Sequence, residues 1–318
     1  MYADDIHSSI CDCSADSRTY MHASSSFQSP EGPATKRARL EGDFVFLNSQ
    51  SSASHDAQIF DPPPSEGNFI HDNGSSDNII HIPFGGDFSG FAWNAQALFA
   101  QKASRQVRKR YRALELIKTH DFGCISETHG LLGRQDALWL PQGVEALWSH
   151  GSSRIGGVGL WIKTKFLEQF TEQSWVEVEP GRVAKLQLRG ESGGLDLFCC
   201  YLDTNSSYNR QQSITRMSRH IQPNDKVLTV ITGDFNFVEA DEDRWNMDGG
   251  TFSGSNNLNG HDASVFKSLL RDMHGIHEWA QPFFTCDAGG ARSRIDRMYC
   301  NQHITYQLDR HCSCSALE

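Results

Sequence analysis

Extended and helical patterns alternate between residues 182 and 236. Residues 182–189 alternate between two sets of side chains, and residues 195–202 are apolar except for Asp196, with a glycine turn at 190–194 between them. This pattern predicts two strands joined by a tight turn. Residues 208–221 follow with a helical pattern, and the run Val-Leu-Thr-Val-Ile-Thr at 227–232 predicts a buried strand. A chain ordered in this way packs helices against a β-sheet.

The same mixture of elements extends to both sides of this stretch. Further strands are expected at 91–94, 121–126, 157–162 and 298–300, and helices at 102–119 and 262–279. In the second of these helices one face carries four apolar residues, Val265, Leu269, Met273 and Ile276. Because the strands come in groups between helices, the sequence predicts an α/β sandwich of two packed β-sheets flanked by helices.

The first 88 residues differ in composition from the rest. They contain 15 serines and the triplet Pro62-Pro63-Pro64, with 4 basic and 13 acidic side chains, so that 9 of the chain's 10 net negative charges lie there. Such a segment buries too little apolar surface to offset its ordering entropy. We therefore predict a disordered, acidic leader at 1–88 and a single domain at 89–318. That domain is close to neutral, which neither supports nor excludes binding of a nucleic acid.

The cysteines and a short basic cluster bear on the cellular compartment in which the protein is expected. None of the nine cysteines forms the paired CxxC pattern of a zinc site, so reduced intracellular thiols are expected, with a disulfide framework or a zinc site as the alternative. Neither a membrane span nor a secretory signal is expected. Lys36-Arg37-Ala38-Arg39 is interpreted as a solvated charge run, or alternatively as a nuclear localisation signal.

The predicted strand at 227–232 ends in Gly233-Asp234-Phe235-Asn236. In an extended chain, residues two apart point to the same side, so Asp234 and Asn236 can both face one ligand. A carboxylate can hold a cation or accept a proton, and a neutral amide can donate to a phosphate oxygen. The alternative is an ordinary turn after a strand, where Asp and Asn are common.

Two further carboxylates stand at or within predicted strands. Glu127 follows the buried strand 121–126, where an isolated carboxylate is costly unless it binds a cation. Asp296 lies between apolar residues in the predicted last strand and has arginines at 292, 294 and 297 around it. A surface glutamate and a solvated edge strand are the alternatives for these two positions.

Five short segments together resemble the endonuclease/exonuclease/phosphatase superfamily in order and spacing: Trp93-Asn94, Ser126-Glu127-Thr128-His129, Tyr201, Gly233–Asn236 and Ser293–Tyr299. The resemblance covers about 90–310 and implies a four-layer α/β sandwich that hydrolyses phosphoesters with Mg²⁺, or with Mn²⁺ in its place. It also implies the residue roles. Glu127 and Asn94 would bind the metal, Tyr201 and Asn236 would contact the phosphate, Asp234 would act on the attacking water, and Asp296 would hold a histidine base.

Two details resemble the endonuclease domains of non-LTR retrotransposons: the pair Asp243-Arg244 after the Asp-Phe-Asn motif, and Thr128-His129 after the glutamate. They imply a DNA endonuclease in which Arg244, His129 and Arg294 bind the substrate. Arg244 could instead pair with a loop carboxylate. Another phosphoester substrate, such as RNA or a lipid headgroup, and a catalytically inactive remnant remain as alternatives. The basic residues of 102–112 could contact phosphates or form a solvated helix face.

The sequence departs from the family pattern near its end. Members finish with a Ser-Asp-His motif beyond the last strands, and no Asp-His pair occurs before Glu318. His311 is not equated with the family histidine, so we expect a truncated product that lacks the catalytic base and the final strand. In addition, Phe284-Thr285-Cys286 stands where relatives usually have Thr-x-Trp. Loss of the base would reduce hydrolysis by about 10²–10⁴-fold.

Overall fold

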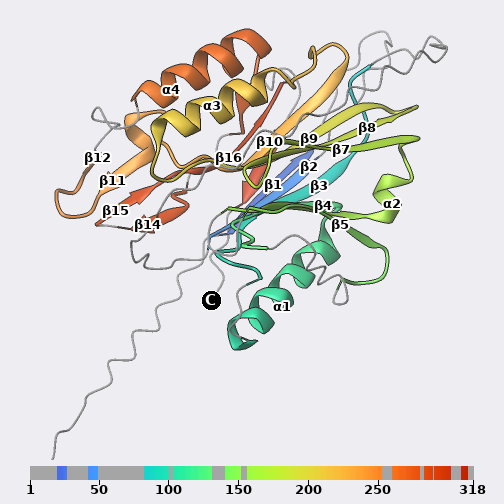
Figure 1. Ribbon diagram of the computed structural model, residues 1–318, viewed down its shortest axis with the longest axis horizontal. Coiled ribbons are helices and arrows are strands. Elements are labelled where there is room, and N and C mark those ends of the chain that lie inside the picture. Colours follow the sequence, from blue (N-terminus) through green and yellow to red (C-terminus); the bar gives the residue numbers. More distant parts are fainter. Residues whose placement is uncertain are drawn as a thin grey trace, which may run out of the picture.

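Two β-sheets form the middle of the molecule in the computed structural model (Figure 1). The structure describes residues 20–26, 42–48, 82–99, 103–130, 140–151, 156–252, 260–279, 283–288, 290–301 and 309–313. Within these ranges the first sheet has the order β17-β1-β2-β3-β4-β6-β5 and the second has the order β13-β16-β10-β9-β8-β7. Each contains parallel and antiparallel pairs; for example, β9 and β10 are parallel whereas β10 and β16 are antiparallel.

The strands of the first sheet are β1 (Tyr20–Ser26), β2 (Gly42–Asn48), β3 (Phe88–Asn94), β4 (Phe122–Ser126), β5 (Val144–Ser149), β6 (Val158–Lys163) and β17 (Asp309–Ser313). Those of the second are β7 (Glu172–Glu179), β8 (Val183–Gly190), β9 (Gly193–Tyr201), β10 (Val227–Asp234), β13 (His277–Glu278) and β16 (Asp296–Cys300). A smaller sheet is formed by β11 (Arg244–Asn246), β12 (Thr251–Phe252), β14 (Cys286–Ala288) and β15 (Ala291–Ser293).

Helices cover the outer faces of both sheets (Figure 1). Helix α1 (Ala103–Thr119) lies on the first sheet, where Leu116 and Ile117 pack against Trp161 and its neighbours. Helices α3 (Ser207–Ser218) and α4 (Gly260–Phe266) lie on the second sheet. The short helix α2 (Thr164–Leu167) follows β6. This arrangement of two mixed sheets between helices confirms the predicted α/β sandwich.

The two sheets bury a common apolar layer. Leu160 of the first sheet and Leu186, Leu197 and Val230 of the second are at most 2 % exposed and belong to one cluster. The central strands β6, β8, β9 and β10 contribute alternate side chains to this layer, as their pleat requires. Apolar burial is the main favourable term in folding, so this layer holds the two sheets in a fixed position relative to each other.

The predicted helix 262–279 is shorter and less regular in the structure. Helix α4 ends at Phe266, a π-helix continues over Lys267–Asp272, and the helical turns end before Gly275, which has a φ of +64°. A π turn holds more residues than an α turn and rotates everything after it. Met273 consequently leaves the apolar face and is 64 % exposed, so its predicted place on that face is wrong.

Part of the predicted leader belongs to the folded domain. Phe84 is 1 % exposed and packs on Phe88, Phe166 and Phe170, and its backbone N–H donates to the carbonyl of Gly194 at 2.9 Å. The predicted boundary at 88 is therefore too late, because an aromatic contact across the core outweighs the polar composition around it. Strands β1 and β2 also fall inside 1–88, and β2 pairs in parallel with β3.

The remaining residues before Ile82, including the basic cluster 36–39, lie outside the described part of the chain. After β16 the chain adds β17 at the edge of the first sheet, beyond β1. The predicted loss of a closing strand stays a prediction. Among the described helices, none has the length and apolar character needed to cross a membrane.

Candidate active site

The predicted catalytic residues meet at one end of the sandwich. Strands β3 and β4 are parallel, with Asn94 opposite Ser126, and β9 and β10 are parallel, with Tyr201 opposite Asp234. Because the carboxyl ends of parallel strands lie at one edge, the residues that end these strands come together. Asp296 begins the antiparallel strand β16 directly opposite Asp234. The structure thus brings these predicted residues to one place, while their roles stay predictions.

One hydrogen bond joins the two sheets at this end. The side-chain amide of Asn94 donates to Oδ2 of Asp234 at 3.0 Å, and both residues are buried. The other oxygen of Asp234 accepts the backbone N–H of Asn236 at 2.9 Å, while the Asn236 amide donates to the carbonyl of Leu202 at 2.9 Å. The Asp-Phe-Asn segment is therefore held by its own side chains, and the Asp234 carboxylate has a defined orientation.

Gly233 is the residue that allows the end of β10 to approach β9. Its φ is +144°, and a Cβ added there would lie 1.9 Å from the carbonyl oxygen of Cys200. No side chain fits at that distance. The glycine before Asp234 is thus required by backbone contact rather than by the chemistry of the site.

Glu127 begins a tight turn after β4. Glu127 and His129 both have a φ of +52°, and the turn is held by N–H groups of Thr128 and His129 that donate to the carbonyls of Gly157 and Gly156 at 3.1 Å each. Left-handed conformations cost about 1 kcal/mol or more in non-glycine residues and concentrate at functional sites. The turn directs Glu127 toward Tyr201, whose hydroxyl also contacts Oγ1 of Thr204 at 3.2 Å.

The charges of the site repel one another in a buried setting. Burial raises the pKa of Asp234 well above its ordinary value, and the charges of Asp296 and Glu127 raise it further. Burial also raises the pKa of Asp296 to about 7, with Glu127 adding to the effect. The pKa of the Tyr201 hydroxyl is raised by burial and then by Glu127 and Asp234. Tyr201 therefore stays neutral at physiological pH and can donate a hydrogen bond.

These carboxylates fit a hard divalent cation, because a positive charge would relieve their repulsion and oxygen is the ligand that Mg²⁺ prefers. Within the described residues, however, no group of three or more His, Cys, Asp and Glu side chains gathers around a common point. Mg²⁺ usually keeps several waters and takes one or two protein carboxylates together with substrate phosphate. The donor set of the site suits that mode of binding and not a closed protein cage.

Thr285 supports Asp296 from the neighbouring loop. Its hydroxyl oxygen accepts the backbone N–H groups of Ile295 and Asp296 at 3.1 and 3.0 Å, and Thr285 itself is 5 % exposed. The sequence singled out this position only as a departure from the family pattern. His311 lies on β17, which is separated from β3 by β1 and β2, so the structure does not place its strand beside the site.

The arginines predicted to bind substrate differ in their surroundings. Arg294 is held by Asp243, with its Nε 3.3 Å from Oδ1, and its Nη2 donates to the carbonyl of Glu242 at 3.0 Å. Asp243 also accepts the backbone N–H groups of Glu239 and Ala240 at 2.9 Å and pairs with the buried Arg297. Asp243 is thus a structural counter-ion for Arg294 and Arg297.

Arg244 and His129 have other neighbours. Half-buried Arg244 lies on β11 opposite Ser293 of β15. Burial raises the pKa of Cys286 on β14 to about 12, the charges of Asp296 and Asp234 raise it further, and the charge of Arg244 lowers it. The pKa of His129 is lowered mainly by burial, while the charge of Glu127 raises it and that of Lys109 lowers it. His129 is therefore beside Glu127 and neutral at physiological pH.

Arg182 is a site neighbour that the sequence did not indicate. Its guanidinium carbon lies 5.0 Å from the centre of the Tyr201 ring, and its Nη2 is 3.2 Å from Oδ2 of Asp203. A cation over an aromatic face is favourable and fixes the ring. Arg182 begins the predicted strand 182–189 and directly precedes β8, and the alternating pattern of that strand carries no sign of the contact with Tyr201.

Comparison with known proteins places these observations in a family. Residues 91–310 match the Endonuclease/Exonuclease/phosphatase family, and no curated protein matches the sequence. Among solved structures, an AP endonuclease from Leishmania major has 15 % identity and a TM-score of 0.47 over 66 % of this chain and 77 % of its own. An AP endonuclease from Archaeoglobus fulgidus has 16 % identity and a TM-score of 0.47 over 66 % and 85 %.

The endonuclease domain of TRAS1, a telomere-specific non-LTR retrotransposon, is similar at 13 % identity and a TM-score of 0.40, over 66 % of this chain and 83 % of that domain. These structural similarities are too low to transfer a substrate. The family match spans more than half of the chain and includes the five segments that form the site. The chain therefore belongs to the endonuclease/exonuclease/phosphatase family, whose members are mostly metal-dependent phosphoesterases.

Proposed function

We propose that this protein hydrolyses phosphodiester bonds with Mg²⁺, and that it cuts DNA as an endonuclease of the non-LTR retrotransposon type. The observation that carries the proposal is the hydrogen bond from Asn94 to Asp234, which joins the two sheets beside Glu127, Tyr201 and Asp296. A buried cluster of carboxylates, an amide and a neutral phenol is suited to an anionic phosphate only if a cation accompanies it.

Glu127 and Asn94 are the residues that would hold Mg²⁺, or Mn²⁺ in its place. Oδ1 of Asn94 accepts the backbone N–H of Gln96 at 3.1 Å, which fixes the orientation of the Asn94 side chain. When bound, the cation neutralises charge on the phosphate and makes water easier to deprotonate. Asp234, whose carboxylate Asn94 and Asn236 orient, takes the proton of the attacking water.

Two hydrogen-bond donors of the site are assigned to the phosphate of the substrate. The neutral hydroxyl of Tyr201 and the amide of Asn236 donate to phosphate oxygens, where charge grows during the reaction. Asp296 would hold the histidine base of the family, for which this sequence offers no counterpart, so we assign the proton of the attacking water to Asp234 alone. Arg244 and His129 contact the substrate beyond the scissile phosphate, and Arg294 supports that side through Asp243.

The substrate class rests on sequence features rather than on the fold. Asp243-Arg244 and Thr128-His129 are the pairs that favour the retrotransposon type. Half-buried Arg244 lies on β11 opposite Ser293, and we assign its guanidinium to a DNA phosphate. An intracellular location is part of the same proposal, and nuclear entry through residues 36–39 is the alternative to a solvated charge run at these positions.

Nicking of supercoiled plasmid in Mg²⁺ tests the function. The wild-type chain should convert it to the open circle, Asp234→Asn should lower the rate at least about 100-fold, and EDTA should stop it. Asp225→Asn removes an exposed carboxylate elsewhere and should leave the rate unchanged. Release of nucleotides from an RNA tail, or of phosphate from a phosphoinositide, without nicking would show that the substrate is wrong. No hydrolysis of any of these substrates in Mg²⁺ or Mn²⁺ would show an inactive member of the family.

A further inference from the structure

The structure assigns to Lys109 of α1 a positioning role that deepens the proposed function and rests on it. We infer that its ammonium group clamps the turn after β3 and thereby sets Asn94 and Glu127 side by side. Its Nζ donates to the carbonyl oxygen of Ala95 at 2.6 Å and also to that of Gln96. A single charged donor therefore reaches two consecutive carbonyls of the residues that follow Asn94.

The turn needs such a donor because its backbone is unusual. Gln96 and Ala97 both have left-handed conformations, with φ values of +43° and +68°, and neither is glycine. Non-glycine residues persist in this region only where the surroundings hold them. The backbone N–H of Gln96 also folds back onto Oδ1 of Asn94 at 3.1 Å, so the conformation of the turn and the orientation of the Asn94 side chain are coupled.

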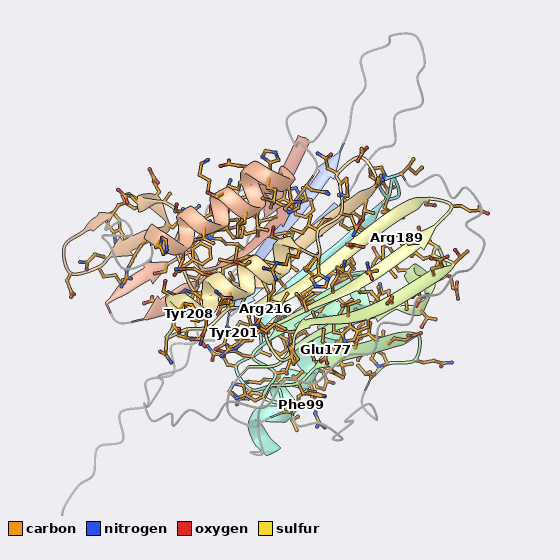
Figure 2. All side chains as sticks on the ribbon, turned by 45° about the horizontal axis from the view of Figure 1, so that its top comes forward. Phe99, Glu177, Arg189, Tyr201, Tyr208 and Arg216 are labelled. Carbon is orange, nitrogen blue, oxygen red and sulfur yellow. The ribbon has the colours of Figure 1, made fainter. Side chains whose placement is uncertain are left out.

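The turn is also tied to the segment that carries Glu127. The backbone N–H groups of Ala95, Ala97 and Phe99 donate to the carbonyls of Ser126, Glu127 and Thr128 at 2.9, 2.6 and 2.9 Å. The chain after β3 thus runs along the chain after β4 for five residues. Phe99 fixes the far end of the segment after β3, because the centre of its ring lies 5.0 Å from that of Trp148. Figure 2 shows Phe99 near α1.

Lys109 enters this arrangement from a helix and not from either loop. The body of α1 is anchored on the first sheet by Ala113, Leu116 and Ile117, all at most 1 % exposed. Helix α1 therefore places the ammonium group of Lys109 against the backbone between Asn94 and Glu127, the two proposed metal ligands. Lys109 itself is not proposed as a ligand.

Three variants test the clamp. Lys109→Met removes the donor, Lys109→Arg keeps a charged donor, and Lys118→Met removes an exposed lysine of the same helix that pairs only locally with Glu115 at 2.6 Å. Hydrogen–deuterium exchange of the 94–100 peptide reports the turn directly. Mn²⁺ titration followed by electron paramagnetic resonance reports the metal ligands without any turnover. Circular dichroism checks that each variant is folded.

We expect Lys109→Met to speed exchange of the Ala95 and Ala97 amides and to weaken Mn²⁺ binding about tenfold, as loss of a group that orients metal ligands does. The apparent Mg²⁺ constant for nicking should rise by the same factor, while the rate at saturating Mg²⁺ changes little. Lys109→Arg should recover most of the loss, and Lys118→Met should match the wild type in both measurements.

Unchanged exchange in folded Lys109→Met overturns the clamp. Faster exchange with unchanged Mn²⁺ binding overturns its connection to Asn94 and Glu127, and therefore the proposal. If the wild-type chain binds no Mn²⁺ and nicks no DNA, the proposed function fails. The exchange measurement then decides the clamp alone, because it needs neither metal nor substrate.

Discussion

Replacement of Asp296 by asparagine should make the metal-free protein more stable, and the gain should grow with pH. Burial moves the pKa of this carboxyl from 3.8 to about 7 in the folded chain. Below about pH 4 the group is protonated in both states and contributes no difference. Between about pH 4 and pH 7 the unfolded chain loses the proton while the folded chain keeps it, so the free energy of unfolding falls as pH rises.

The size of the effect follows from the shift. About three pKa units correspond to about 4 kcal/mol at 1.36 kcal/mol per unit. Asp296 is 5 % exposed, so little solvent screening reduces this value. The asparagine side chain cannot ionise, and the substitution also removes one of the charges that raise the pKa of Asp234. The advantage of the variant should therefore approach about 4 kcal/mol above pH 7 and vanish near pH 4.

Urea unfolding in EDTA at several pH values between 4 and 8 measures this difference. Asp225→Asn serves as the control for loss of an exposed carboxylate. Addition of Mg²⁺ should shrink the advantage of Asp296→Asn at high pH, because a ligand that binds only the folded chain stabilises it. A difference between wild type and Asp296→Asn that stays constant within about 0.5 kcal/mol from pH 4 to pH 8 would refute the reasoning.

Three other substitutions test contacts that hold the folded domain together, each by urea unfolding. Gly233→Ala should cost at least about 3 kcal/mol because its Cβ meets the Cys200 carbonyl oxygen; a loss below about 1 kcal/mol would contradict that contact. Phe84→Ala should cost about 3–5 kcal/mol by opening a cavity in the aromatic cluster, and a neutral result would return residue 84 to the leader. Arg210→Met should cost about 3–5 kcal/mol because it leaves Asp262 buried without its partner at 2.6 Å; the double variant with Asp262→Leu should regain most of this, and equal losses would exclude the ion pair.

Local periodicity in the sequence determined most of the elements that carry the site. The strands at 182–189 and 195–202 and the helix at 102–119 occur as expected, because period-2 and period-3.6 patterns reflect which face of a local element is buried. The site residues at the ends of the strands were identifiable because five short segments resemble the family in their order and spacing. The sequence therefore determined which residues reach the end of the sandwich.

What only the tertiary structure decided is which distant groups those residues meet. Asn94 and Asp234 are 140 positions apart, and their hydrogen bond depends on how two sheets stack. The sequence allowed Lys109 to be one of several basic residues on a solvated helix face. Its hydrogen bond to the carbonyl of Ala95 depends on how the turn after β3 packs against α1. The close approach of β10 to β9, the partner that each buried charge pairs with, and the rotation of the chain after the π-helix all depend on packing between residues far apart in the sequence. A pattern in the sequence records burial at each position, but not the identity of the partner across the core.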